Sequence, residues 1–92
     1  MAYFVGFTSR AEKQLHDLPR EVQEAVADLR RELAVEPRGP GTKKLKGARA
    51  HTRYSRRIGR AYRVVFTIDD ESDMVLIVLI GPRGDVYRGL GR

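Results

Sequence analysis

The chain has 92 residues and a mass of 10.5 kDa, and we expect a single domain over residues 1–92. It contains no cysteine, which excludes disulfide bonds, thiolate zinc sites and iron–sulfur clusters. The longest apolar run, Met74 to Ile80, is too short to cross a bilayer, and no charged-then-apolar leader opens the chain. We therefore expect a cytoplasmic protein that does not contact a membrane.

The net charge is +6, from 18 Lys and Arg against 12 Asp and Glu, with a pI near 10.2. Residues 37–67 hold ten basic residues and no acidic one, whereas residues 1–36 and 68–92 each have a net charge of −2. Because ten like charges in one segment repel each other, binding to a polyanion is favoured over a merely solvated basic face.

In chain order, the first half is expected to form a strand and two helices. Tyr3 to Thr8 is rich in aromatic and β-favouring residues, which is typical of a strand. Ser9 and Glu12 have the spacing of a capping box, which predicts that Ser9 caps a short helix. Pro19 then separates this helix from a second one, from Arg20 to Val35, whose apolar residues recur at helical spacing. So short a break predicts an antiparallel helix hairpin.

The second half is expected to form a three-stranded antiparallel meander. Its strands are predicted at Thr52 to Arg57, Ala61 to Asp69 and Met74 to Ile80, with turns at Gly59 and at the acidic segment 69–73. The last strand is apolar at every position, which suits a central strand covered on both faces. The element order predicts an α+β fold in which both helices pack on one side of a four-stranded sheet.

Alternation along the second strand of the meander separates its two faces. The residues that share the apolar face, and are expected to pack on the helices, are Tyr62, Val64, Phe66 and Ile68. Arg63 then lies on the opposite face of the sheet. We expect its guanidinium to be exposed there, with a buried structural arginine as the alternative.

Few chemistries remain open to this chain. His16 and His51 lack metal-ligand spacing, and the sequence has no phosphate-binding loop, dinucleotide fingerprint or nucleophile elbow, so we expect no metal and no cofactor. An arginine fork matches the geometry of a phosphate, and a tyrosine ring can stack on a base. In RNA the 2′-hydroxyl beside the scissile phosphate can be the nucleophile, so arginine and tyrosine can support cleavage by position and charge.

Four segments of the sequence contain motifs that together indicate a protein family. They are Met1-Ala2-Tyr3-Phe4, Lys44-Leu45-Lys46-Gly47, the strand Gly59…Tyr62-Arg63-Val64-Val65-Phe66, and Gly81-Pro82-Arg83-Gly84-Asp85-Val86-Tyr87. Together, and in this element order, they resemble RelE-type toxins of the RelE/ParE superfamily of bacterial toxin–antitoxin systems. The resemblance runs from Ala2 to Tyr87.

The resemblance implies an endoribonuclease (an mRNA interferase) that enters the ribosomal A site and cuts mRNA there, through attack of the 2′-hydroxyl, leaving a 2′,3′-cyclic phosphate. By position, Arg63 matches the arginine that holds the scissile phosphate, and Arg83 the arginine that assists the leaving oxygen or stabilises negative charge. Tyr87 matches the tyrosine that stacks on the substrate. The resemblance also implies a cognate antitoxin, and we expect it to carry an acidic segment that neutralises residues 37–67.

The strand before Arg63 departs from the family pattern, which has two basic residues at alternate positions, one of them the proposed general base. With Tyr54 and Ile58 in the core, the residues on the open face would be Arg53, Ser55 and Arg57. A bulge would bring Arg56 there instead. Arginine is a poor general base because its pKa lies above about 12, so we expect these residues to act electrostatically.

Arg53 is therefore placed with the catalytic residues Arg63, Arg83 and Tyr87. The residues expected to bind RNA are Lys43, Lys44, Lys46, Arg56, Arg57 and Arg60. Two other functions stay open: a ParE-like toxin, which shares the fold but inhibits DNA gyrase, and a non-catalytic RNA-binding module.

Overall fold

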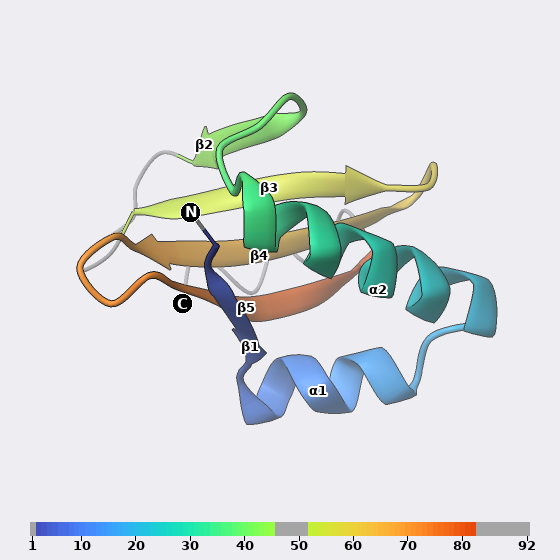
Figure 1. The fold of residues 1–92 in the computed structure, drawn as a ribbon. Helices are drawn as coiled ribbons and strands as arrows, with labels where there is room; N and C mark the ends of the chain where they lie inside the picture. Colours follow the sequence, from blue (N-terminus) through green and yellow to red (C-terminus); the bar gives the residue numbers. More distant parts are fainter. Residues whose placement is uncertain (1, 46–51, 83–92) are drawn as a thin grey trace.

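The computed structural model describes residues 2–45 and 52–82, which form two helices and a five-stranded sheet (Figure 1). The elements are β1 (Phe4–Phe7), α1 (Ser9–His16), α2 (Arg20–Val35), β2 (Thr42–Leu45), β3 (Arg53–Ile58), β4 (Tyr62–Asp69) and β5 (Met74–Pro82). Their order in the sheet is β1-β5-β4-β3-β2; β1 runs parallel to β5, and all other neighbours are antiparallel. The predicted α+β class, helix hairpin and meander are confirmed.

The predicted number of strands is wrong by one, because the sheet also contains β2. This strand pairs with β3, placing Lys43 opposite Ser55 and Lys44 opposite Tyr54. Its sequence, Thr-Lys-Lys-Leu, has little intrinsic β preference, so pairing with β3 rather than local sequence makes it a strand. Lysines on such an edge strand also oppose edge-to-edge association.

The core lies between the sheet and the two helices. Its buried residues from the middle of the chain are Val26, Leu29 and Leu33 on α2 and Val64 and Phe66 on β4. β5 lies between β1 and β4 and is buried on both faces, since Ile77 belongs to this core and Leu79 to a smaller cluster with Val65. The prediction of a central apolar strand is therefore confirmed.

The N-terminal cap of α1 is Thr8, so the predicted capping role of Ser9 is wrong. The hydroxyl oxygen Oγ1 of Thr8 accepts a hydrogen bond of 3.1 Å from the backbone N–H of Ala11. Thr8 has extended dihedral angles and Ser9 is the first helical residue, so only Thr8 has the geometry of a cap. The capping-box spacing identified the helix start to within one residue.

Replacing Thr8 by alanine is expected to lower the free energy of unfolding by about 1 kcal/mol, because the first turn of α1 loses its side-chain acceptor. Urea denaturation followed by circular dichroism measures this loss. Ser9→Ala is the matched control, since Ser9 is exposed and within the helix, and we expect it to change stability by less than about 0.5 kcal/mol. A larger loss for Ser9→Ala than for Thr8→Ala would contradict the observed cap.

Candidate nucleic-acid interface

β3 turns alternate residues toward and away from the helices. Tyr54 stacks on Phe66, with ring centroids 5.9 Å apart, and Ile58 belongs to the core. The residues of β3 that face away from the helices are consequently Arg53, Ser55 and Arg57. This is the arrangement expected from the sequence when the strand has no bulge, and the pairing of β3 with β4 is continuous from Arg53 to Ile58.

The strand register collects basic residues on this side of the sheet. Lys43 of β2 lies opposite Ser55, and Arg57 of β3 lies opposite Arg63 of β4. Residues that face each other across antiparallel strands point to the same side of the sheet. The side chains that define this surface, which we name the basic face, are Lys43, Arg53, Arg57 and Arg63. Their fields add, so the face attracts a polyanion such as RNA.

Arg63 lies on the basic face but is buried, with only 6% of its surface exposed. The expected exposed guanidinium is therefore wrong, and the alternative of a buried arginine is correct. Arg63 sits on an inner strand, between Arg57 on β3 and Gly81 on β5. Alternation assigns a residue to a face, but it does not show how far the neighbours cover it. Its burial restricts the Arg63 side chain to a fixed position.

Arg56 lies on the helix side of the sheet, away from the basic face. Its Nη2 atom is 2.5 Å from Oε1 of Glu32 on α2, and its side chain is 16% exposed. The alternative in which a bulge brings Arg56 to the open face is therefore wrong. The ion pair joins β3 to α2, so Arg56 is held in a structural contact.

The other predicted site residues are less closely grouped. Lys44 is exposed on the edge strand β2 but lies opposite Tyr54, on the helix side, and Arg60 is exposed in the turn after β3. The predicted site residues that lie outside the described residues are Lys46, Arg83 and Tyr87. The described part of β5 ends at Pro82, and Gly81 lies opposite Arg63.

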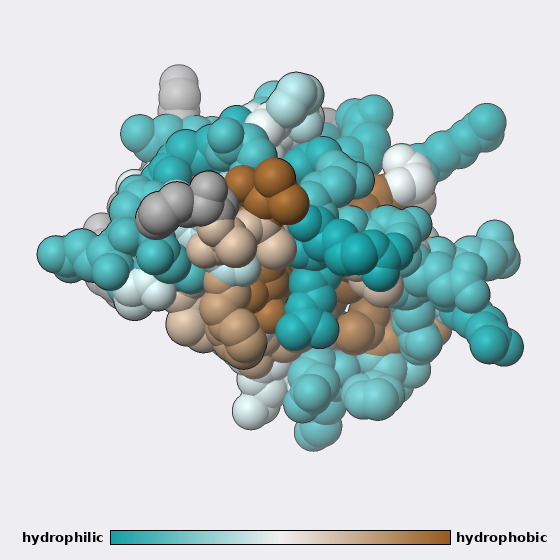
Figure 2. Space-filling model, viewed as in Figure 1, coloured by the Kyte–Doolittle hydropathy of each residue, from teal (hydrophilic) through white to brown (hydrophobic). Residues whose placement is uncertain are grey.

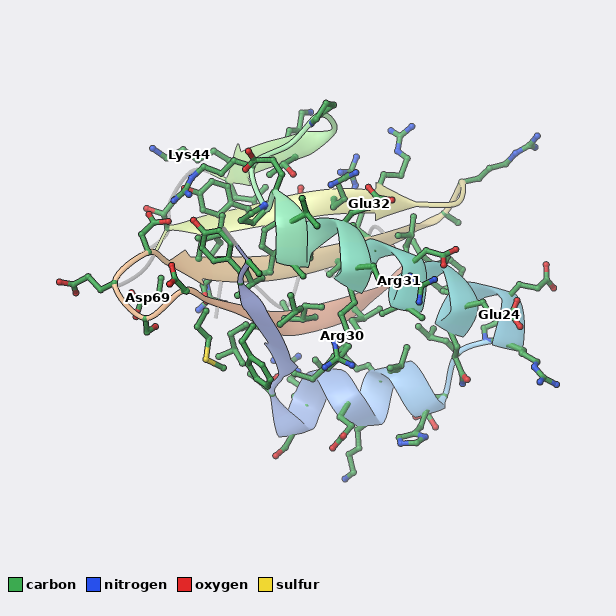
Figure 3. The ribbon with its side chains drawn as sticks, viewed as in Figure 1. Glu24, Arg30, Arg31, Glu32, Lys44 and Asp69 are labelled. Atoms are coloured by element: carbon green, nitrogen blue, oxygen red, sulfur yellow. The ribbon has the colours of Figure 1, made fainter. Side chains whose placement is uncertain are left out.

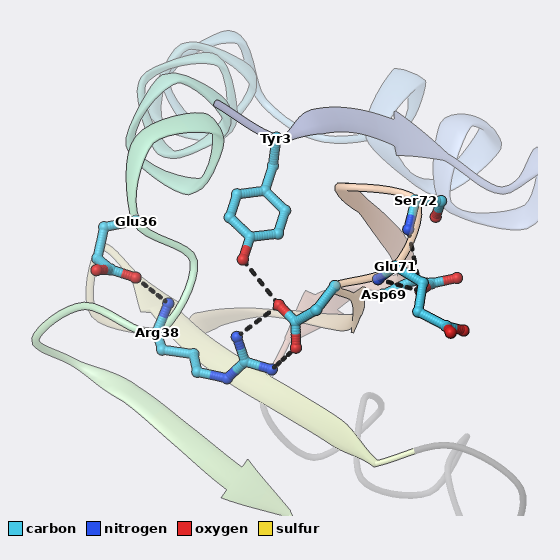
Figure 4. A network of polar contacts seen from close by, with 7 residues as sticks. Tyr3, Glu36, Arg38, Asp69, Glu71 and Ser72 are labelled. Atoms are coloured by element: carbon cyan, nitrogen blue, oxygen red, sulfur yellow. Dashed lines mark hydrogen bonds and ion pairs between the residues drawn. The ribbon is translucent and has the colours of Figure 1, made fainter. Parts of the chain in front are cut away.

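Arg38, in the loop after α2, belongs to the basic segment but already has partners (Figure 4). Its guanidinium donates two hydrogen bonds, of 2.9 and 3.1 Å, to the carboxylate of Asp70, and lies 5.6 Å from the ring centroid of Tyr54. The Tyr3 hydroxyl donates a 2.8 Å hydrogen bond to the same carboxylate. These contacts tie the start of the chain and the loop before β2 to the acidic turn after β4.

The two donors, Arg38 first and then Tyr3, hold the pKa of Asp70 below its ordinary value. A carboxyl group whose pKa is lower in the folded than in the unfolded chain stabilises the fold above its unfolded pKa, and this contribution is lost as the pH falls through the folded pKa. We expect wild type to be more stable than Asp70→Asn at pH 7, and the difference to disappear as the pH falls from about 4 through the folded pKa. Urea denaturation at a series of pH values measures it. A difference independent of pH would contradict a role for the ionised carboxylate.

Within residues 2–45 and 52–82, no group of three or more His, Cys, Asp or Glu side chains is placed to hold a metal ion. No helix in the same part of the chain is long and apolar enough to span a membrane.

The fold and the sequence match a known class of proteins. Residues 5–87 match the family model described as the ParE toxin of the type II toxin–antitoxin system parDE. The chain belongs to this RelE/ParE family of toxins, as the sequence motifs predicted.

Individual relatives are of the RelE type. The chain is 39% identical over 89 residues to Toxin RelG of Mycobacterium tuberculosis, an alignment that covers 96% of this chain and 99% of the relative. It resembles the toxin–antitoxin complex RelBE2 of M. tuberculosis with 35% identity and a TM-score of 0.78, covering 92% of this chain and 95% of that one. The archaeal RelE–RelB complex of Pyrococcus horikoshii OT3 gives 28% identity and a TM-score of 0.78, covering 91% and 98%.

Proposed function

We propose that this toxin is a metal-independent, ribosome-dependent endoribonuclease that cuts mRNA in the ribosomal A site and so inhibits translation. The observation that carries the proposal is the basic face, on which Lys43, Arg53, Arg57 and Arg63 lie together. The RelE and RelG names of its relatives support this reading over other activities of the superfamily.

The proposed reaction transfers the phosphoryl group from the 5′-oxygen to the 2′-oxygen. The 2′-oxygen forms a bond to phosphorus and the bond to the 5′-oxygen breaks, leaving a 2′,3′-cyclic phosphate. The 2′-hydroxyl loses a proton, and the leaving 5′-oxygen gains one. Negative charge on the phosphoryl oxygens grows in the transition state, so fixed cations stabilise that state more than the bound substrate.

Arg63 is the residue we assign to the scissile phosphate, because its burial fixes its position before the substrate binds. Arg57 adds positive charge directly opposite Arg63, and Arg53 adds it further along β3, opposite Thr67. By their match to the family pattern, Arg83 would assist the leaving oxygen and Tyr87 would stack on the substrate. Arginine does not accept a proton near neutral pH. The proposal therefore assigns proton transfer to a group other than the arginines, and the positioning of the mRNA to the ribosome.

We also propose a cognate antitoxin as partner. The relatives from M. tuberculosis and P. horikoshii were both solved as complexes with an antitoxin. An acidic segment of such a partner would neutralise the basic face and compete with RNA for it.

The alternative is a toxin that inhibits DNA gyrase, because the matching family model carries the name ParE. The purified protein added to a translating extract separates the two functions. We expect mRNA to be cut within translated codons while gyrase-dependent DNA breaks stay at background. DNA breaks with intact mRNA would overturn the proposal in favour of the gyrase inhibitor. RNA binding without cleavage would indicate a non-catalytic RNA-binding module instead of a nuclease.

A further inference from the structure

A hollow with a volume of ≈ 700 Å³ lies at the end of the sheet where β4 turns into β5. Arg53 lines it, so the hollow and the basic face share this arginine. Arg53 lies opposite Thr67, and Thr67 lies opposite Leu76, which also lines the hollow. Residues in such a row across β3, β4 and β5 point to the same side of the sheet. The hollow therefore continues the basic face, and its size is typical of a ligand-binding pocket.

The floor of the hollow is apolar. Besides Leu76, the apolar side chains of β5 that line it are Met74 and Val78. The pairing of β4 with β5 has a bulge between Val65 and Phe66, at which Val78 has no partner in the register. An extra residue of this kind turns side chains that strict alternation would place elsewhere. Val78 accordingly packs against the buried cluster that contains Val65, on the side of the sheet away from the helices.

β1 extends this apolar floor to the edge of the sheet. Gly6 lies opposite Leu76, and Phe4 lies opposite Met74. A Cβ atom added at Gly6 would lie 3.4 Å from Cε of Met74 and 3.6 Å from Cε2 of Phe4, so these side chains gather over the glycine. Phe4 is 64% exposed, and brown and tan atoms reach the surface where β1 passes α2 (Figure 2). An apolar surface beside an arginine suits a nucleotide, which has a base with apolar faces and an anionic phosphate.

The part of the hollow at the turn after β4 is acidic. The acidic residues that line it are Asp69, Asp70 and Glu71. Figure 3 shows Asp69 at the end of β4, beside the turn. Its Oδ1 atom accepts hydrogen bonds of 3.0 and 3.4 Å from the backbone N–H groups of Glu71 and Ser72, which fix the carboxylate (Figure 4). Oδ2 takes no part in these two bonds, so it can accept a hydrogen bond from a ligand. A carboxylate repels a phosphate but accepts from the amino group of a base.

We propose that this hollow binds one base of the mRNA and selects a base with an exocyclic amino group, such as cytosine, over uracil. Arg53 holds the phosphate of that nucleotide, the apolar floor contacts the face of the base, and Oδ2 of Asp69 accepts its amino group. The inference rests on the proposed binding of mRNA to the basic face. Thr67 and Arg63 are four residues apart on β4, about 13 Å, so the selected nucleotide lies beyond those joined by the scissile phosphate.

The test compares the bases around the cut for wild type and Asp69→Asn in a pool of mRNAs added to a translating extract. The asparagine oxygen can still accept the hydrogen bonds of the turn, but its amide donates where the carboxylate accepted. At one fixed position relative to the cut, we expect wild type to cut sites with uracil about tenfold less than sites with cytosine. We expect Asp69→Asn to lose or reverse this preference. The matched control is Asp28→Asn, the same change at a 67% exposed side chain on α2, and we expect it to keep the wild-type profile.

A binding measurement separates the base site from the nuclease function. Fluorescence anisotropy with short labelled oligocytidylate and oligouridylate is expected to show tighter binding of the cytidylate by wild type and no such difference for Asp69→Asn. If wild type cuts mRNA with the same base profile as Asp69→Asn, the base site is overturned and the nuclease function stands. If wild type cuts no mRNA, the nuclease function fails, and the base site stands or falls with the dependence of the oligonucleotide preference on Asp69. Thermal denaturation of both variants shows whether a change reflects a loss of folding.

Discussion

Replacing Arg63 by alanine is expected to lower the rate of mRNA cleavage on the ribosome by about 10²- to 10³-fold. Arg63 is 6% exposed and lies opposite Arg57, so its guanidinium is the cation of the basic face whose position is best fixed. A fixed cation acts on the transition state without a cost of ordering, which makes its removal more damaging than that of a mobile surface arginine. Single-turnover cleavage of a programmed ribosome complex measures the effect.

Two further variants test whether the loss of cleavage in Arg63→Ala is specific to the Arg63 guanidinium. Arg63→Lys keeps the charge and loses the planar fork, and we expect it to recover only part of the rate. Arg20→Ala removes an arginine whose side chain is 88% exposed on α2, and we expect it to cut mRNA at the wild-type rate. If Arg63→Ala folds and its cleavage and RNA binding fall by the same modest factor, Arg63 is a phosphate contact and not a catalytic residue.

Replacing Phe66 by alanine is expected to lower the free energy of unfolding by about 3–5 kcal/mol. Phe66 is fully buried on β4, and its ring stacks on Tyr54 of β3. The substitution removes both the buried apolar surface and the stacked pair and leaves a cavity under α2. A domain of this size is stable by only about 5–15 kcal/mol, so we expect a substantial shift in the urea midpoint.

The control for this truncation is Val35→Ala, which also shortens an apolar side chain but at a position that is 73% exposed. We expect it to change stability by less than about 0.5 kcal/mol. A loss for Phe66→Ala no larger than for Val35→Ala would contradict the placement of Phe66 at the centre of the core.

The elements with strong internal patterns were predictable. α2 was predicted from Arg20 to Val35, as found, because its apolar residues recur at helical spacing and its ends carry proline signals. The central position of β5 followed from its unbroken apolar run. β2 was missed, because a four-residue edge strand with two lysines is stabilised by its pairing with β3 and not by its own sequence.

The sequence predicted which side of the sheet the site residues occupy, but not how deeply they are buried. The period of two assigned Arg57 and Arg63 to one face, and the structure agrees. The burial of Arg63 is a property of the folded chain, in which β3 and β5 flank β4, and alternation along β4 alone does not predict it. The same holds for the contact between Arg38 and Asp70, residues 32 positions apart that meet only through the fold. Arg56 was predicted to bind RNA because the sequence shows its charge but not its ion-pair partner. In the structure that partner is Glu32.

The measurement that tests the central claim most directly is mapping of mRNA 3′ ends after brief addition of the protein to translating ribosomes, with Arg63→Ala in parallel. Wild type is predicted to produce new 3′ ends that carry a 2′,3′-cyclic phosphate, lie inside translated codons and disappear when ribosomes are omitted. Arg63→Ala is predicted to give these ends at a rate at least about 100-fold lower. Unchanged mRNA with wild type, or equal cleavage by the two proteins, would contradict a ribosome-dependent nuclease that works through the basic face.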